Sequence, residues 1–138
     1  MKTSSRSHPG NQLHQRPVAL VIGFLLIALT RTVLADAAAV ERGGNVFDEE
    51  CAECHSLREG KNKKGPTLFN VVGRSAGTEP GYLYSAALKK GGFSWTTDKL
   101  DEYVKRPKAV IPDGKMKYSG LADASARSDL IEFLAEQK

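Results

Sequence analysis

Two thiols and an imidazole stand together in the run Cys51-Ala52-Glu53-Cys54-His55. Cysteines three positions apart lie about one helical turn apart, so both can bond covalently to the two vinyl groups of one porphyrin. The adjacent histidine is then held under the metal, where an imidazole nitrogen ligates iron. Because these are the only two cysteines in the chain, the sequence predicts one covalently attached haem c and leaves no cysteine for a structural disulfide.

Other uses of a C-x-x-C pair fit this chain less well. A thiol-redox pair is expected after a β-strand in a βαβ unit, whereas Val46 to Glu50, directly before the motif, has the character of a helix. A structural zinc site needs about four cysteine or histidine ligands, and the chain after residue 35 cannot supply them. A short disulfide loop would leave His55 unexplained, so haem attachment accounts for the motif best.

The second axial position of the iron is assigned by elimination. His8 and His14 lie in a segment that we expect to be removed, so His55 is the only histidine left and ligation by two histidines is excluded. Met116 is likewise the only methionine besides Met1, and it lies in a Pro/Gly loop between two lysines. Such a loop is a poor place to bury a methionine that has no ligand. If a second strong side-chain ligand exists, Met116 is the natural candidate, and a lysine or an open site are the alternatives.

Two filled axial positions leave the iron little room for a substrate, so electron transfer is the chemistry that remains. We therefore expect an electron carrier, not an enzyme, with no small-molecule substrate. A haem enzyme or a gas-binding protein with a labile sixth ligand is the alternative. An enzyme of that kind needs a distal acid or base, and no histidine other than His55 is left to serve as one.

The first 35 residues have the features of a cleavable secretory signal peptide. A positively charged start precedes a 12-residue apolar run from Val18 to Leu29, and small or apolar residues lead up to Ala35. Cleavage after Ala37 or Ala39 would be nearly as good. The apolar run is short for a membrane span, although an uncleaved membrane anchor is the alternative. We expect export to the periplasm, because haem of this type is attached outside the cytoplasm.

Removal of residues 1–35 leaves residues 36–138, which is the size of one domain. The formal net charge of +4 belongs to the leader, which holds four of the 20 basic residues and none of the 16 acidic ones. The remaining chain is neutral, so its charge gives no support for nucleic-acid binding. A phosphate-binding loop, a zinc-finger spacing and an internal repeat are also absent from the sequence.

Hydrophobic spacing predicts an all-α domain without a useful strand. Segments 56–81 and 107–120 are rich in glycine, proline and lysine and are expected to be loops. A large apolar cofactor would complete the small core. The caps and apolar faces predict helices at residues 38–54, at Tyr82–Leu88, from an N-cap at Thr96 to Pro107, and from an N-cap at Asp123 or Ser125 onward.

The order of these features resembles that of class I cytochromes c, the mitochondrial type and its bacterial periplasmic relatives, over about residues 40–137. Gly43 and Phe47 precede the haem motif as in the first helix of that family. Leu130 and Phe133 match the family's last helix, which crosses the first. The resemblance implies a small class I cytochrome c fold, in which helices wrap around one covalently attached haem.

The resemblance also implies roles for residues around the haem. Pro66 matches the proline whose carbonyl accepts a hydrogen bond from the ligand imidazole. Arg74, Tyr84 and Trp95 match donors to the haem propionates, and Tyr103 matches a tyrosine near the methionine sulfur. His55 and Met116 are then the two metal ligands. The full set expected to bind the cofactor is Cys51, Cys54, His55, Pro66, Arg74, Tyr84, Trp95, Tyr103 and Met116.

The chain departs from the family pattern at several positions. Leu88 stands where relatives often have a buried asparagine, and Gly114 replaces a common threonine of the methionine loop. Glu50 and Glu53 stand where relatives often have lysine or glutamine near the exposed haem edge. The last two differences bear on the choice of redox partner.

Loop lysines would ring the exposed haem edge if this fold holds, and a basic ring steers a protein onto acidic partners. We expect a monomer that docks through this edge with membrane-bound or periplasmic redox complexes. The lysines concerned are Lys61, Lys63, Lys64, Lys89, Lys90, Lys108, Lys115 and Lys117.

Overall fold

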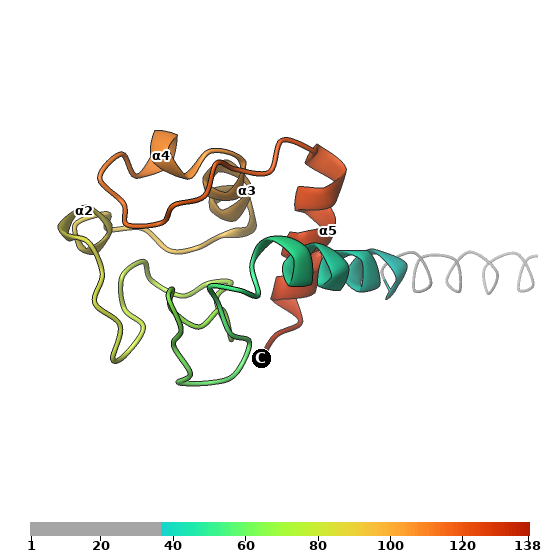
Figure 1. Cartoon of the computed structure of the whole chain (residues 1–138), viewed down its shortest axis with the longest axis horizontal. Coiled ribbons are helices and arrows are strands. Elements are labelled where there is room, and N and C mark those ends of the chain that lie inside the picture. The colour runs from blue at the N-terminus through green and yellow to red at the C-terminus, as the bar shows by residue number, and fades with distance from the viewer. Residues whose placement is uncertain (1–36) are drawn as a thin grey trace, which may run out of the picture. The chain divides into compact units, whose positions relative to one another are not determined.

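A computed structural model describes residues 37–138 of the chain, so the predicted signal peptide lies outside the described residues. In this range the first helix runs over residues 37–50, and the others are α2 (Ala86–Lys89), α3 (Thr97–Lys105), α4 (Pro107–Val110) and α5 (Ala124–Ala135) (Figure 1). The only β pairing in the same range is an isolated bridge between Ser75 and Ser94. The all-α prediction is therefore confirmed. Among the described helices, none is long and apolar enough to cross a bilayer.

The predicted cap at Thr96 starts α3, since the Thr96 hydroxyl accepts a hydrogen bond of 3.1 Å from the backbone N–H of Lys99. The helix ends at Lys105, ahead of Pro107, as expected. Pro107 then opens α4, in a segment predicted to be a loop. A proline is well suited to the first turn of a helix, where its missing N–H would have no intrahelical partner.

The two other capped helices agree with the prediction to different degrees. Asp123 caps α5, because its carboxylate accepts a 2.7 Å hydrogen bond from the N–H of Ala126. The short helix expected at Tyr82–Leu88 begins only at Ala86, where the Ser85 hydroxyl caps α2. Tyr82 instead belongs to the preceding loop, and its hydroxyl donates to the carbonyl of Lys64 at 3.0 Å.

The first helix and α5 cross at Gly43 (Figure 1). A Cβ atom at Gly43 would lie 2.0 Å from the carbonyl oxygen of Asp129, so only glycine allows the two backbones to approach this closely. Phe47 and Phe133 pack beside the crossing with ring centroids 5.8 Å apart. At the crossing, the Arg42 guanidinium donates two hydrogen bonds, of 2.6 and 2.9 Å, to the carboxylate of Asp129. The crossing expected from the family resemblance is therefore present.

The buried core joins these helices to the long loops. Leu130 on α5 is almost fully buried, and Val71, Trp95 and Leu100 belong to the same apolar cluster. The last residues of the chain also hold a loop, because the carbonyl of Gln137 accepts a 2.6 Å hydrogen bond from the N–H of Asn70. The loops between the first helix and α3 are thus fixed against a helical frame.

Candidate haem-binding site

The cysteine pair lies in a turn directly after the first helix. The backbone N–H of Cys51 donates to Phe47 at 2.8 Å, and that of His55 donates to Cys51 at 2.9 Å. Residues 51–54 are therefore a tight turn and not the continued helix that was predicted over 38–54. The turn keeps Cys51, Cys54 and His55 within one compact unit.

Both cysteines are half-buried, and they are not joined in a disulfide. Burial, with a smaller contribution from Glu50, raises the pKa of the Cys51 thiol to about 11. The thiolate is the reactive form in disulfide exchange, and burial of Cys51 opposes its formation there. Residues 37–138 also contain no group of three or more histidine, cysteine or acidic side chains that could hold a metal ion. A protein-only zinc site is therefore not supported in this range.

The His55 ring is fixed in the orientation that a metal ligand needs. Its Nδ1 lies 2.7 Å from the carbonyl oxygen of Pro66, which can only accept, so Nδ1 carries the proton and Nε2 keeps its lone pair. Burial lowers the pKa of His55, and the hydrogen bond to Pro66 opposes this change in part. Burial thus favours the neutral imidazole, which is the form that binds iron.

The His55 imidazole packs against the backbone of Gly65. A Cβ atom at Gly65 would be 2.3 Å from Cε1 of His55, so the space that a side chain would occupy is filled by the ring. With Nδ1 bonded to Pro66 and the ring packed against Gly65, Nε2 is the nitrogen left for a metal. Together with two half-buried thiols one turn earlier, this donor set fits a haem c.

The structure brings Arg74 and Trp95 together through their backbones. The N–H of Trp95 donates to the Arg74 carbonyl at 2.9 Å, and the N–H of Gly73 donates to the Trp95 carbonyl at 2.8 Å. The buried indole of Trp95 packs on Tyr103 with ring centroids 4.8 Å apart. Three of the predicted cofactor-binding residues therefore form one cluster.

Tyr84 lies in a neighbouring loop, half-buried, with its ring edge-on to Tyr82 at a centroid distance of 4.8 Å. Burial raises the pKa of the phenols of both Tyr84 and Tyr103 above the ordinary value. Both hydroxyls therefore stay protonated across the physiological range and can act as hydrogen-bond donors.

Met116 lies half-buried in the loop that follows α4, and this loop is tied to the rest of the site at two points. Tyr118 donates a 2.8 Å hydrogen bond to the carboxylate of Glu50, the residue before Cys51. Lys115 donates to the carbonyl of Leu83 at 2.7 Å. The methionine loop is thus attached both to the cysteine turn and to the loop that contains Tyr84.

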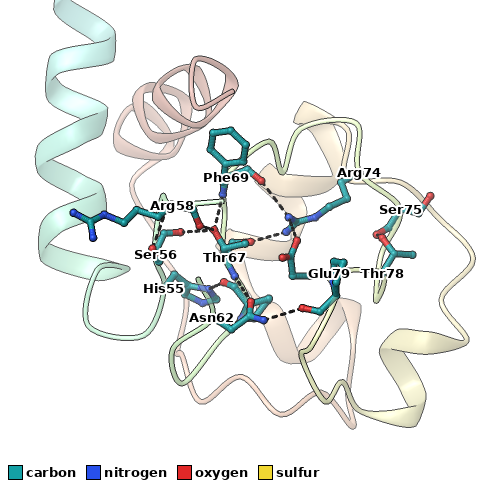
Figure 2. A network of polar contacts seen from close by, with 12 residues as sticks. His55, Ser56, Arg58, Asn62, Thr67, Phe69, Arg74, Ser75, Thr78 and Glu79 are labelled. Carbon is teal, nitrogen blue, oxygen red and sulfur yellow. Dashed lines mark hydrogen bonds and ion pairs between the residues drawn. The ribbon is translucent and has the colours of Figure 1, made fainter. Parts of the chain in front are cut away.

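Arg74 has partners that the sequence did not predict. One terminal nitrogen, Nη1, lies 2.6 Å from a Glu79 carboxylate oxygen and 3.1 Å from the carbonyl of Phe69. The other, Nη2, donates to the carbonyl of Thr67 at 2.7 Å. Figure 2 shows the guanidinium between these three groups. The predicted donor to a haem propionate is therefore already held in place by the protein.

Comparison with known proteins agrees with this geometry. The family model described as "Cytochrome c" matches residues 40–138. Cytochrome c2 of Rhodopila globiformis is 44% identical over 96 residues, which cover 70% of this chain and 91% of that protein. Cytochrome c of Arabidopsis thaliana is 44% identical over 98 residues, covering 70% and 88%. A solved structure of cytochrome cH from Methylobacterium extorquens matches with a TM-score of 0.65 and 38% identity, covering 69% of this chain and 95% of that one.

The chain belongs to the cytochrome c family. It has the small all-α class I fold, it carries one covalently attached haem c, and it is an electron carrier. The family resemblance and the fold predicted from sequence are thereby confirmed.

Sequence reasoning missed the polar network that holds the loops of this cytochrome together (Figure 2). Asn62 donates to the carbonyl of Pro80 at 2.9 Å and accepts from the N–H of Thr67 at 2.9 Å. The buried hydroxyl of Thr67 lies 2.8 Å from the carbonyl of Arg58 and accepts from the N–H of Phe69. A loop has no periodic pattern, so the only available signal was the number of small polar residues in 56–81.

Two of the departures from the family pattern, at Leu88 and Gly114, have local explanations in the cytochrome. Leu88 is half-buried and packs against the apolar core, so an apolar side chain replaces a buried polar one. A Cβ atom at Gly114 would lie 3.1 Å from both Cγ2 and the carbonyl oxygen of Ile111. The turn from Ile111 to Gly114 is therefore too tight for a threonine without a shift of Ile111.

Proposed function

We propose that this cytochrome is an exported single-electron carrier in which His55 and Met116 are the axial ligands of the haem iron. Cys51 and Cys54 are the sites of covalent attachment. The observation that carries the proposal is the placement of His55, whose Nδ1 is bonded to Pro66 while its ring lies on Gly65. Met116 is the only methionine after Met1, and its loop is tied to Glu50 beside the cysteine turn.

The protein side chains set the properties of the electron-transfer centre. The haem, when bound, accepts and releases one electron. The Pro66 carbonyl makes the His55 imidazole more electron-rich and fixes its tautomer. The Met116 thioether is a soft ligand and favours the reduced iron. Anchors on both sides of the methionine loop hold it in one geometry, so little rearrangement accompanies a change of charge.

The features of residues 1–35 support export to the periplasm, and they lie outside the described residues. Exposed lysines on the methionine loop support docking with acidic redox partners. Lys117 and Lys108 line a groove of about 390 Å³ with Tyr118. We propose that a monomer uses this face to meet membrane-bound or periplasmic redox complexes.

Spectroelectrochemical titration of the exported holoprotein tests the proposal. A carrier should titrate reversibly as a single one-electron couple, and its ferric form should bind cyanide slowly because both axial positions are filled. Fast cyanide binding together with turnover of peroxide would instead support the haem enzyme or gas-binding protein with a labile sixth ligand.

A further inference from the structure

Glu79 is one of two buried acidic residues among residues 37–138, and none of the roles above uses it. Five ion pairs occur in this range, and Arg74–Glu79 is the only one in which both side chains are less than one-fifth exposed, at 17% and 8%. A buried charge is costly unless an opposite charge accompanies it. The charges of Arg74 and Glu79 therefore depend on each other, and the two side chains act as a unit.

Within this unit, Glu79 supplies the full negative charge. The other partners of the Arg74 guanidinium are the carbonyls of Thr67 and Phe69, which are neutral dipoles. Glu79 lies closest, at 2.6 Å from Nη1. The carboxylate thus fixes where the guanidinium points and also offsets its positive charge.

Arg74 is connected to the iron ligand by a short series of contacts. Its Nη2 holds the carbonyl of Thr67, and the preceding residue, Pro66, holds the His55 ring. Its backbone is bonded to Trp95. Thr67 and Pro66 are adjacent in the chain, so the Arg74 guanidinium lies close to the carbonyl that orients the His55 imidazole. A negative charge that offsets the positive charge of Arg74 therefore also acts on the haem site around His55.

We propose that Glu79 is a positioning residue that holds Arg74 and lowers the reduction potential of the haem, an inference that rests on the proposed electron-carrier function. Reduction of the iron adds one electron and so removes one positive charge from the site. An uncompensated arginine favours the reduced state, whereas a buried carboxylate favours the oxidised state. The ion pair keeps the two effects nearly balanced.

The decisive comparison is between Glu79→Gln and Glu59→Gln in the holoprotein. Glu59 lines the same groove of about 420 Å³ as Arg74 and Glu79, but it is exposed to solvent. A glutamine at position 79 keeps an oxygen that can accept from Arg74 and loses only the charge. We expect Glu79→Gln to raise the equilibrium constant for reduction at least about threefold, or about 28 mV, since a tenfold change is about 59 mV for one electron. Glu59→Gln should change it much less, because water screens that charge.

A double variant separates an electrostatic role from a merely structural one. Arg74→Gln should lower the potential, and Arg74→Gln combined with Glu79→Gln should return it close to the wild-type value, because both charges are then gone. A purely structural pair predicts that the double variant is disturbed at least as much as either single variant. If Glu79→Gln gives no folded holoprotein, the double variant alone decides between these two outcomes.

A shift in Glu79→Gln that is downward, or no larger than that in Glu59→Gln, overturns the proposal. Failure of the electron-carrier function itself has a different signature, because the wild type would then show no reversible one-electron couple. Urea unfolding of each variant provides a second readout, since loss of the ion pair should reduce the free energy of unfolding whatever the potential does.

Discussion

At the scale of single residues, a few neighbouring atoms determine the tautomer and the position of the His55 ring. The Pro66 carbonyl at 2.7 Å selects the tautomer, and the missing side chain of Gly65 makes room for the ring. Neither contact forms a bond to a metal, yet together they leave Nε2 as the available ligand atom. A proline and a glycine thus position the imidazole that we propose as an iron ligand.

Gly65→Ala should therefore disturb the proposed haem ligand, His55. The added methyl group would lie 2.3 Å from Cε1 of His55, so the ring has to move away from Gly65 and from the Pro66 carbonyl. We expect a changed absorption spectrum and reduced haem incorporation, both measured on the expressed protein.

Gly60→Ala is the matched control for that substitution. Gly60 has φ +64° with no atom within 4 Å of the added methyl group, so the change strains the backbone but meets no side chain. This variant should lose about 1 kcal/mol of stability and keep the wild-type spectrum. An unaltered spectrum in Gly65→Ala would contradict the account given for His55.

Sequence alone could predict the residues whose signal is local. Cys51, Cys54 and His55 form a motif of five consecutive positions, and Gly65-Pro66 follows at a short distance. Glu79 and Asn62 could not be found in this way. Their partners are decided by how two irregular loops fold against each other, and a loop carries no repeating pattern that reveals such contacts.

At the scale of elements, the helix crossing at Gly43 organises the frame. Gly43→Ala should lower the free energy of unfolding by at least about 1–3 kcal/mol, the usual cost of overpacking, because its Cβ would lie 2.0 Å from the Asp129 carbonyl oxygen. Gly44→Ala is the control, since its Cβ would lie 3.3 Å from the ring of Phe133, which can move. Equal urea unfolding curves for the two variants would rule out the close backbone contact.

The ion pair at the same crossing makes a pH-dependent contribution to stability. The hydrogen bond from Arg42 is the main cause that lowers the pKa of Asp129 below its ordinary value. A carboxyl whose folded pKa is depressed stabilises the fold above its unfolded pKa of about 3.9, and this contribution is lost as the pH falls through the folded pKa. Arg42→Gln should therefore destabilise the protein at pH 7 and do so less at pH 3.

Denaturation of wild type and variant at several pH values measures this difference. Arg58→Gln is the control, because the exposed Arg58 belongs to none of the five ion pairs of residues 37–138. A difference between wild type and Arg42→Gln that stays constant from pH 7 to pH 3 would show that Arg42 contributes through packing and not through charge.

The helices differ in how far the sequence could predict them. α3 and α5 have a capping side chain followed by regularly spaced apolar residues, and both begin where predicted. α2 and α4 are four residues long. A single turn is not stable on its own, so their presence depends on tertiary packing, and the sequence placed α2 too early and α4 not at all.

At the scale of the whole molecule, we expect docking with redox partners to depend on local charge more than on net charge. The chain after residue 35 is neutral by count, yet basic residues gather around the methionine loop, where Arg106, Lys108 and Lys117 line one groove. Some loop lysines are engaged within the protein, for example Lys115 with the Leu83 carbonyl. Lys117 is exposed and is therefore the better probe of partner docking.

Lys117→Glu should slow electron transfer to an acidic redox partner about three- to tenfold at low salt, because it reverses a charge that steers the encounter. The defect should shrink near physiological ionic strength, where screening shortens the reach of the field to about 8 Å. Lys138→Glu changes the net charge equally, but the exposed Lys138 lies at the chain end beyond α5 and is not one of the lysines expected to ring the haem edge, so this reversal should slow transfer less. Equal effects of the two reversals would indicate that net charge, and not this face, controls the encounter.

The central claim is that Met116 is the second iron ligand, and the visible spectrum of the ferric protein tests it most directly. The wild type should show the weak sulfur-to-iron band near the red edge of the visible range, and Met116→Ala should abolish the band and let added imidazole bind quickly. Lys117→Ala, at the next residue, should retain the band. A Met116→Ala protein whose spectrum is the same as that of the wild type would contradict the assignment and require a different axial ligand.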